Sequence, residues 1–86
     1  MKQMSYTIKD PDGIHARPAG LLVKKLQSFP CSINIAKGEK SADGKRLFAV
    51  MKLGVTQGET INFTFDGENE DEALEATVEV LKETGL

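Results

Sequence analysis

The side chains best suited to chemistry in this sequence stand close together in residues 13–20, which read Gly-Ile-His-Ala-Arg-Pro-Ala-Gly. Proline disrupts a helix interior but is tolerated in the first turn, where its missing N–H would have no partner in any case. Because an apolar stripe begins at Ala19, we expect a helix to start shortly before Pro18. This places His15 at or beside the N-cap of the helix and Arg17 in its first turn.

A histidine in this position could accept a phosphoryl group. The N-terminus of a helix presents unpaired N–H groups and a partial positive charge, which together attract anions. The guanidinium of Arg17 adds a permanent cation whose geometry matches a phosphate. Both features oppose protonation of His15, so we expect a neutral ring with a free lone pair for attack on phosphorus. The pattern therefore predicts a phosphohistidine site, in which positioning and charge neutralisation supply most of the effect.

Two simpler interpretations of the same residues exist. The histidine could only cap the helix or stand in solvent, and the helix start could bind small anions without any transfer chemistry. We favour phosphoryl transfer because histidine, arginine and proline occur within four residues, follow a glycine turn and open the first predicted helix.

Length and composition limit the other possibilities. With 86 residues the chain has room for one domain, residues 1–86, and its 40% hydrophobic and 28% charged residues are typical of a globular protein. The net charge of −2 gives no bulk attraction to nucleic acid or to an anionic membrane. No apolar run is long enough to span a bilayer and the N-terminal segment has no signal-peptide pattern. We therefore expect a cytoplasmic protein without direct membrane insertion.

Cysteine and histidine are too scarce for several kinds of site. Cys31 is the only cysteine and has no partner for an internal disulfide, and His15 is the only histidine. A disulfide scaffold, a zinc module and a Cys/His protease are therefore excluded. We expect the chain to need no metal or other cofactor of its own.

The elements that must position these residues can be predicted from hydrophobic periodicity. Apolar and polar residues alternate in the manner of half-buried strands in residues 3–9, 31–35 and 60–65. A sheet built from these segments has one covered and one solvated face, which favours antiparallel pairing. A shorter strand is expected at residues 40–43, after a hairpin turn at 37–39.

Helical spacing of apolar residues occurs in residues 16–27, 47–53 and 70–83. Before the last of these, Asn69 and Glu72 have the spacing of a capping box. The expected inward positions of this last helix are Ala73, Leu74, Thr77, Val78 and Leu81. The resulting order is strand, helix, strand, strand, helix, strand, helix.

Residues 13–25, which read GIHARPAGLLVKK, closely resemble the active-site signature of HPr, the histidine-containing phosphocarrier family of the bacterial phosphoenolpyruvate:sugar phosphotransferase system. The resemblance extends over the whole chain without insertions, including the later segment KRLFAVMKLGVTQGETI. It implies an α+β open-faced β-sandwich of order βαββαβα, with a four-stranded antiparallel sheet and three helices on one face.

The same resemblance implies a function. His15 would accept a phosphoryl group on its δ nitrogen from Enzyme I, which is charged by phosphoenolpyruvate, and pass it to IIA domains of sugar permeases for coupled sugar uptake and phosphorylation. Arg17 would hold the phosphoryl oxygens, with help from the backbone amide of Ala16. The protein would thus be an intermediate in transfer between proteins rather than a stand-alone enzyme, and we expect it to act as a monomer.

Transfer between proteins requires an exposed apolar patch around the histidine, small enough for partners to dissociate again. The resemblance places this partner surface on the first helix and on the short second helix, at Gly20, Leu21, Lys24, Gln27, Leu47, Phe48 and Met51. We expect Leu47 and Phe48 to be exposed, because so short a helix cannot bury every residue of LFAVMKL; ordinary core packing is the alternative. A basic rim that would steer acidic partners, or simply be solvated, is expected at Lys24, Lys45, Arg46 and Lys52.

One position departs from the family pattern. The family's regulatory serine, at the start of the short helix, corresponds to Arg46 in this chain. Arginine has no hydroxyl, so phosphorylation by ATP at this position is impossible, and we expect the carrier role without the serine switch. A phosphate there would add a charge of about −1.5 to −2, whereas Arg46 carries a fixed positive charge.

Two further functions are compatible with this sequence: a carrier in a specialised regulatory phosphorelay, and a non-catalytic regulatory binding module on the same fold. The binding module is disfavoured, because relatives of that kind replace the active histidine, whereas His15 and Arg17 are both present here.

Overall fold

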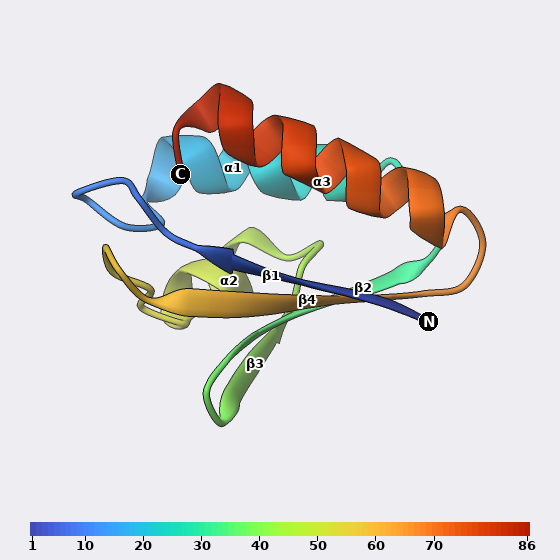
Figure 1. The fold of residues 1–86 in the computed structure, drawn as a ribbon, viewed down its shortest axis with the longest axis horizontal. Coiled ribbons are helices and arrows are strands. Elements are labelled where there is room, and N and C mark those ends of the chain that lie inside the picture. Colours follow the sequence, from blue (N-terminus) through green and yellow to red (C-terminus); the bar gives the residue numbers. More distant parts are fainter.

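The computed structural model describes residues 1–86 and has the predicted order of elements. In chain order these are β1 (Lys2–Thr7), α1 (Ala16–Leu26), β2 (Ser32–Lys37), β3 (Lys40–Asp43), α2 (Leu47–Lys52), β4 (Thr60–Asp66) and α3 (Glu70–Thr84). The four strands form one antiparallel sheet in the order β1-β4-β2-β3. Helices α1 and α3 lie beside each other across one face of this sheet, which confirms the open-faced α+β sandwich (Figure 1). None of the helices combines the length and the apolar character required to cross a membrane.

Alternation along the strands separates the two faces of the sheet. In β4, which pairs with β1 on one side and β2 on the other, the side chains of Ile61, Phe63 and Phe65 are fully buried. The intervening residues face the open side, where the hydroxyls of Thr7 and Thr60 are hydrogen-bonded across β1 and β4 at 2.9 Å. The period-two pattern of the sequence therefore predicted both which residues form strands and which face each side chain occupies.

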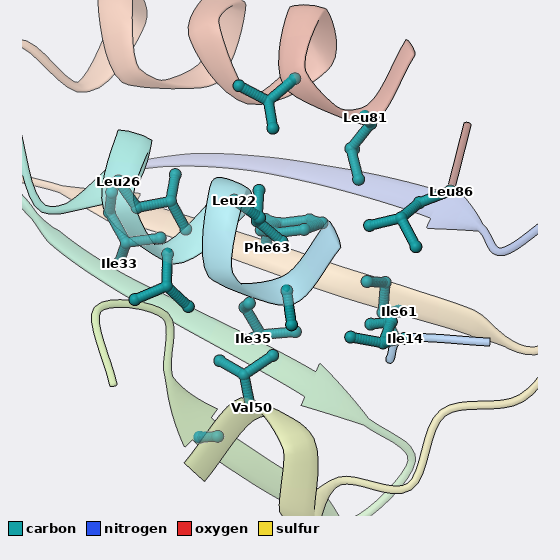
Figure 2. Packing of buried hydrophobic residues seen from close by; sticks show 14 of the residues in the cluster. Ile14, Leu22, Leu26, Ile33, Ile35, Val50, Ile61, Phe63, Leu81 and Leu86 are labelled. Atoms are coloured by element: carbon teal, nitrogen blue, oxygen red, sulfur yellow. The ribbon is translucent and has the colours of Figure 1, made fainter. Parts of the chain in front are cut away.

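The core joins all three helices to the sheet. It is a single cluster of 20 buried apolar residues. Figure 2 shows Leu22 of α1, Val50 of α2 and Leu81 of α3 directed toward the covered side of the sheet. Because each helix is anchored in the same cluster, the start of α1 has a fixed position relative to the strands and their loops.

The start of α3 differs from the predicted capping box. Asn69 is the N-cap residue, but its backbone is left-handed, with φ 61°, and its side chain makes no cap hydrogen bond. A capping side chain usually requires an extended N-cap backbone, whereas asparagine is one of the residues that tolerate the left-handed region. The capping-box prediction is therefore wrong. Glu70, Asp71 and Glu72 still place negative charge in the first turn, where it interacts favourably with the helix dipole.

The inward face of α3 is also rotated relative to the prediction. Leu74 and Val78, which were expected to point inward, are only half-buried. The buried residues of the helix are Ala73, Ala76, Thr77, Val80 and Leu81. This set has the i, i+3, i+4, i+7, i+8 spacing of one helix face. The helix packs against α1 as well as against β1 and β4, so the buried face is the one that both neighbours cover.

Glu59 organises the loop that leads into β4. Its Oε1 atom accepts hydrogen bonds from the Thr56 hydroxyl at 2.7 Å and from the Thr56 backbone N–H at 2.8 Å. The Lys37 ammonium lies 3.4 Å from the other carboxylate oxygen. The hydrogen bonds from Thr56, with a smaller contribution from Lys37, hold the pKa of Glu59 below its ordinary value of 4.5.

We expect Glu59 to make the stability of the protein depend on pH. Because its pKa is lower in the folded than in the unfolded chain, its stabilising effect is complete above 4.5 and is lost as the pH falls through the folded pKa. In Glu59→Gln, the unfolding free energy should therefore decrease less between neutral pH and about pH 3 than in the wild type. Urea denaturation at the two pH values measures this difference.

The matched control is Glu68→Gln, which removes an exposed carboxylate outside this network. It should retain the wild-type loss of stability in acid. An equally steep loss in Glu59→Gln would contradict the prediction.

Candidate functional site

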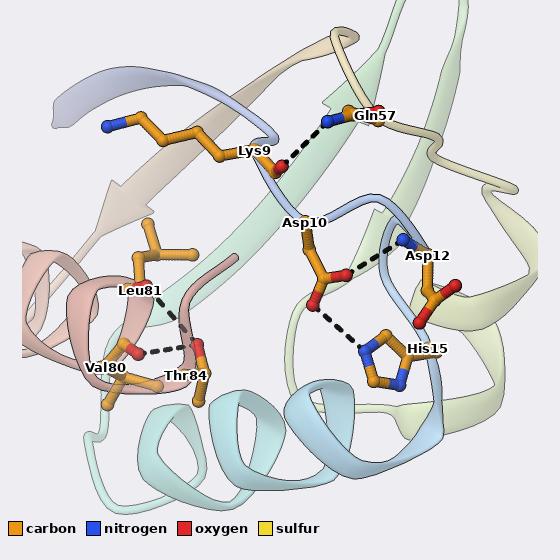
Figure 3. Close-up of polar contacts among 8 residues, drawn as sticks. All are labelled: Lys9, Asp10, Asp12, His15, Gln57, Val80, Leu81 and Thr84. Atoms are coloured by element: carbon orange, nitrogen blue, oxygen red, sulfur yellow. Dashed lines mark hydrogen bonds and ion pairs between the residues drawn. The ribbon is translucent and has the colours of Figure 1, made fainter.

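The loop between β1 and α1 is fastened to the loop that precedes β4. The backbone N–H of Ile14 donates to the carbonyl of Val55 at 3.1 Å. The side-chain amide of Gln57 donates to the carbonyl of Lys9 at 3.1 Å, as Figure 3 shows. Both ends of the segment that carries the predicted chemical residues are therefore held against a second part of the backbone.

Gly13 permits this close approach. Its backbone is left-handed, with φ 68°, which a glycine adopts without strain. A Cβ atom at this position would collide with the carbonyl of Val55 and lie 2.9 Å from the Cα of Thr56. Both the conformation and the lack of a side chain are thus required just before the histidine.

His15 occupies the N-cap of α1, with an extended backbone at φ −106° and ψ 175°. Its side chain makes no hydrogen bond to the helix, so the interpretation of His15 as a helix cap has no support from its contacts. The N–H groups of Ala16 and Arg17 have no backbone acceptor, and Pro18 has no N–H. The first turn therefore presents free donors directly after the imidazole, as the sequence predicted.

The contact partner of His15 is Asp10. The Oδ2 atom of Asp10 lies 3.1 Å from Nε2 of His15, and its Oδ1 atom accepts the backbone N–H of Asp12 at 2.9 Å (Figure 3). The hydrogen bond from the Asp12 N–H and, after it, the one from His15 hold the pKa of Asp10 below its ordinary value of 3.8. Asp10 is therefore ionised at neutral pH and can only accept hydrogen bonds.

The contact between Asp10 and His15 determines which ring nitrogen has a free lone pair. Since an ionised carboxylate cannot donate, Nε2 must carry the proton that lies between His15 and Asp10. In the neutral ring the Nδ1 atom then has the lone pair, and this atom has no hydrogen-bond partner in the protein. The imidazole side chain is 41% exposed, so another molecule can reach the ring that carries Nδ1.

The expectation of a neutral His15 ring rests on the helix N-terminus and Arg17 and takes no account of Asp10, which brings a negative charge to within hydrogen-bond distance of the ring. Asp10 precedes His15 by five residues, and the turn at residues 11–13 brings the two side chains together. No periodic pattern connects residues across such a turn; the only signal was an aspartate in a turn before the histidine.

Asp10, Asp12 and His15 also form the one group of three potential metal ligands in the protein, with their ligand atoms within 4.8 Å of one another. Two of these side chains are hydrogen-bonded to each other, and Asp10 is bonded to the Asp12 backbone as well. Hydrogen bonds within the loop thus already account for the arrangement of Asp10 and His15.

Arg17 lies in the first turn of α1, where the sequence predicted it. Its side chain is exposed and forms no ion pair with any carboxylate of the protein. The guanidinium is therefore available to an anion that approaches the N-terminus of the helix.

The residues predicted to meet partner proteins lie on α1, at its C-cap and on α2, and the two helices pack against each other. Phe48 is 78% exposed and Leu21 is 54% exposed, so two large apolar side chains face solvent. Lys24 and Gln27 are exposed as well, whereas the half-buried members of the set are Gly20, Leu47 and Met51.

The prediction that Leu47 is exposed is wrong. Leu47 and Met51 pack against the core, and Val50 is fully buried within it. Residues i, i+3 and i+4 of a helix share a face, so this inward face turns Phe48 toward solvent. The exposed apolar part of α2 is therefore narrower than expected.

The predicted basic rim is partly engaged within the protein. The Lys45 ammonium donates to the carbonyl of Phe29 at 2.6 Å, and Arg46 lies 3.7 Å from Asp43. Lys24 and Lys52 are exposed without such partners. A shallow groove of about 500 Å³ follows α2 and is lined by Gln27, Lys45, Arg46, Leu47, Phe48, Ala49 and Lys52.

On this open-faced α+β sandwich, an accessible histidine stands beside free helix N–H groups and an unpaired arginine, an arrangement suited to hold an anion such as a phosphoryl group. The family model PTS-HPr, described as "PTS HPr component phosphorylation site", matches residues 2–83. The chain belongs to the HPr family of phosphocarriers of the phosphotransferase system.

Individual relatives agree with this assignment. Phosphocarrier protein HPr of Lysinibacillus sphaericus is 43% identical over 86 residues, which cover 100% of this chain and 98% of the relative. The solved histidine-containing phosphocarrier protein of Mycoplasma is 33% identical, with a TM-score of 0.97 over 99% of this chain and 97% of its own. An HPr dimer from Thermoanaerobacter tengcongensis is 34% identical, with a TM-score of 0.78 over 100% of this chain and 99% of its own. The predicted fold and the general phosphocarrier role are thus confirmed.

Proposed function

We propose that residues 1–86 act as one cytoplasmic carrier domain that takes a phosphoryl group from phosphorylated Enzyme I and delivers it to IIA domains of sugar permeases. Enzyme I would itself be charged by phosphoenolpyruvate. The acceptor atom would be Nδ1 of His15. The observation that carries this proposal is the engagement of Nε2 by Asp10, which leaves Nδ1 as the unpartnered nitrogen of an accessible ring.

The chemistry requires little covalent participation by other residues. The lone pair of Nδ1 forms the new bond to phosphorus, while the bond from phosphorus to the donor breaks and its electron pair stays with the donor. The equatorial phosphoryl oxygens carry the negative charge. The N–H groups of Ala16 and Arg17 and the Arg17 guanidinium are the groups of this chain suited to neutralise it.

Incubation with Enzyme I, Mg²⁺ and phosphoenolpyruvate, followed by intact-mass measurement, tests the proposed function. The wild type should gain one phosphoryl group that is lost in acid, as a phosphohistidine is, and His15→Ala should gain none. A wild type that stays unmodified would contradict the proposal, and so would a phosphoryl group that persists in His15→Ala.

We further propose that partners dock on the surface formed by Leu21 and Lys24 of α1 and by Gln27 at its C-cap, together with Phe48 and the groove along α2. The support is the exposure of Phe48 and Leu21 on two adjacent helices, beside the exposed cations Lys24 and Lys52. Gly20, Leu47 and Met51 are half-buried and would border this surface. Docking of a single copy is sufficient for transfer, so we propose a monomer as the working form.

Phe48→Ala should weaken the binding of Enzyme I by about tenfold, because an exposed aromatic anchor at the centre of a contact typically contributes more than about 1 kcal/mol. Titration calorimetry measures the dissociation constant. Phe48 is on the surface, so the circular dichroism spectrum should match that of the wild type. Undiminished affinity would remove Phe48 from the partner surface.

Regulation by serine phosphorylation is proposed to be absent. Arg46 is the N-cap of α2 and its exposed side chain offers no hydroxyl to a kinase. Incubation with HPr kinase and labelled ATP should leave no acid-stable label on the wild type. Arg46→Ser restores a hydroxyl at the N-cap, a position that serine favours, and should become labelled. Stable labelling of a hydroxyl in the wild type would contradict this prediction.

A further inference from the structure

Asp10 is more firmly fixed than an ordinary loop residue. Its backbone N–H donates to the carbonyl oxygen of Leu86 at 3.2 Å, and its carbonyl accepts the N–H of Gly13 at 2.9 Å. One carboxylate oxygen accepts the N–H of Asp12 and the other faces Nε2 of His15. Every hydrogen-bonding group of Asp10 therefore has a partner, and its side chain is only 17% exposed.

We propose that Asp10 is a positioning residue for phosphoryl transfer, which holds His15 in the tautomer with its proton on Nε2 and opposes the positive charge that the ring acquires when Nδ1 is phosphorylated. This inference rests on the proposed function of His15. It assigns to Asp10 the part that a carboxylate beside a reactive imidazole commonly plays, which is to set its orientation and tautomer.

The charge balance of the step explains why a carboxylate is useful here. When the Nδ1 lone pair forms the bond to phosphorus, the bond between phosphorus and the donor protein breaks and its electron pair leaves with the donor. The proton stays on Nε2, so the ring carries one positive charge. Oδ2 of Asp10 already lies 3.1 Å from Nε2, so no reorganisation is needed to stabilise that charge. Delivery to the next acceptor reverses the step and returns the ring to its neutral tautomer.

The structure distinguishes Asp10 from the neighbouring carboxylate. Asp12 has a ligand atom within 4.8 Å of His15, yet its side chain forms no hydrogen bond to the ring. An effect of charge alone would appear in variants of either residue. An effect of the hydrogen bond would appear only in variants of Asp10.

Asp10→Asn provides a specific test because it is nearly isosteric with the wild type. The side-chain carbonyl of the introduced asparagine would accept the N–H of Asp12, so its NH₂ group would face Nε2 and require a lone pair there. The proton of the neutral ring would then move to Nδ1 and block the nucleophile. We expect ¹⁵N NMR of the imidazole to show Nε2 protonated in the wild type and Nδ1 protonated in Asp10→Asn. The initial rate of phosphorylation by Enzyme I should fall about 10- to 100-fold.

Two further variants complete the test. Asp12→Asn removes the same charge from the same loop and should keep the wild-type tautomer. Asp10→Ala removes the acceptor without adding a donor, and it should show a smaller loss of rate than Asp10→Asn. These results together would support the proposal.

Three results would overturn the proposed role of Asp10: a wild-type ring protonated on Nδ1, the same tautomer in wild type and Asp10→Asn, or an inverted tautomer with an unchanged rate. In the last case the wild type would still be phosphorylated, so the proposed function of His15 would stand. A wild type that takes no phosphoryl group, whatever its tautomer, would instead overturn the function itself and the role of Asp10 in it.

Discussion

Replacing Arg17 with alanine is expected to slow phosphorylation by Enzyme I by about 100- to 1,000-fold, the usual cost of removing one group that stabilises transition-state charge. The guanidinium is the only side-chain cation in the first turn of α1, and it forms no internal ion pair that would compete for it. Rapid-quench measurement of the phosphorylated fraction against time gives the rate. Affinity for Enzyme I should change much less, because the exposed apolar side chains lie elsewhere on α1 and α2.

Two variants make this prediction specific. Arg17→Lys keeps the charge but loses the paired donors of the guanidinium, so its rate should lie between those of the wild type and Arg17→Ala. Lys82→Ala removes a positive charge from the last turn of α3 and should retain the wild-type rate. If Arg17→Ala reacts as fast as the wild type, Arg17 has no part in the transfer step.

The largest loss of stability is expected for Phe63→Ala, at about 3–5 kcal/mol of unfolding free energy. Phe63 has no exposed surface and lies in the central strand β4, opposite Met4 of β1 and Ile35 of β2. Its ring also stacks on that of Phe65, with centroids 6.1 Å apart. Truncation leaves a cavity beneath the helices that the paired strands on both sides prevent from closing. Urea denaturation followed by circular dichroism measures the change.

Phe48→Ala is the matched control for this truncation. The same side chain is removed, but from a position that is 78% exposed, so the unfolding free energy should change by less than about 0.5 kcal/mol. Similar losses in the two variants would contradict the assignment of Phe63 to the core and Phe48 to the surface.

The parts of the structure that could be predicted from the sequence are those in which one local pattern determines the outcome. The alternation of residues 60–65 predicted β4 and its buried face, and Pro18 predicted the start of α1 with His15 at or beside its N-cap, which is where the structure has it. Each of these features depends on residues that are within a few positions of one another in the chain, so the local pattern alone is enough to predict it.

The parts that could not be predicted depend on contacts between elements. The Asp10–His15 pair requires a turn that folds one side chain back onto another, which no periodicity encodes. The buried face of α3 and the inward position of Leu47 depend on the surfaces that cover the two helices. The sequences of both helices were compatible with more than one buried apolar face. A hydrophobic pattern predicts reliably that a helix is amphipathic. It predicts less reliably which residue lies at the centre of the buried face.

The loop between β1 and α1, which precedes His15, is hydrogen-bonded to the residues before β4, and this has a consequence for the binding of partner proteins. Because hydrogen bonds to Val55 and Gln57 already order this loop, the loop does not have to become ordered when a partner protein binds. Little conformational entropy is then lost at each encounter, so a small contact area suffices for a productive collision. Under the proposed function, a complex with a small contact area would also dissociate quickly, which would leave the phosphorylated protein free to bind its next partner.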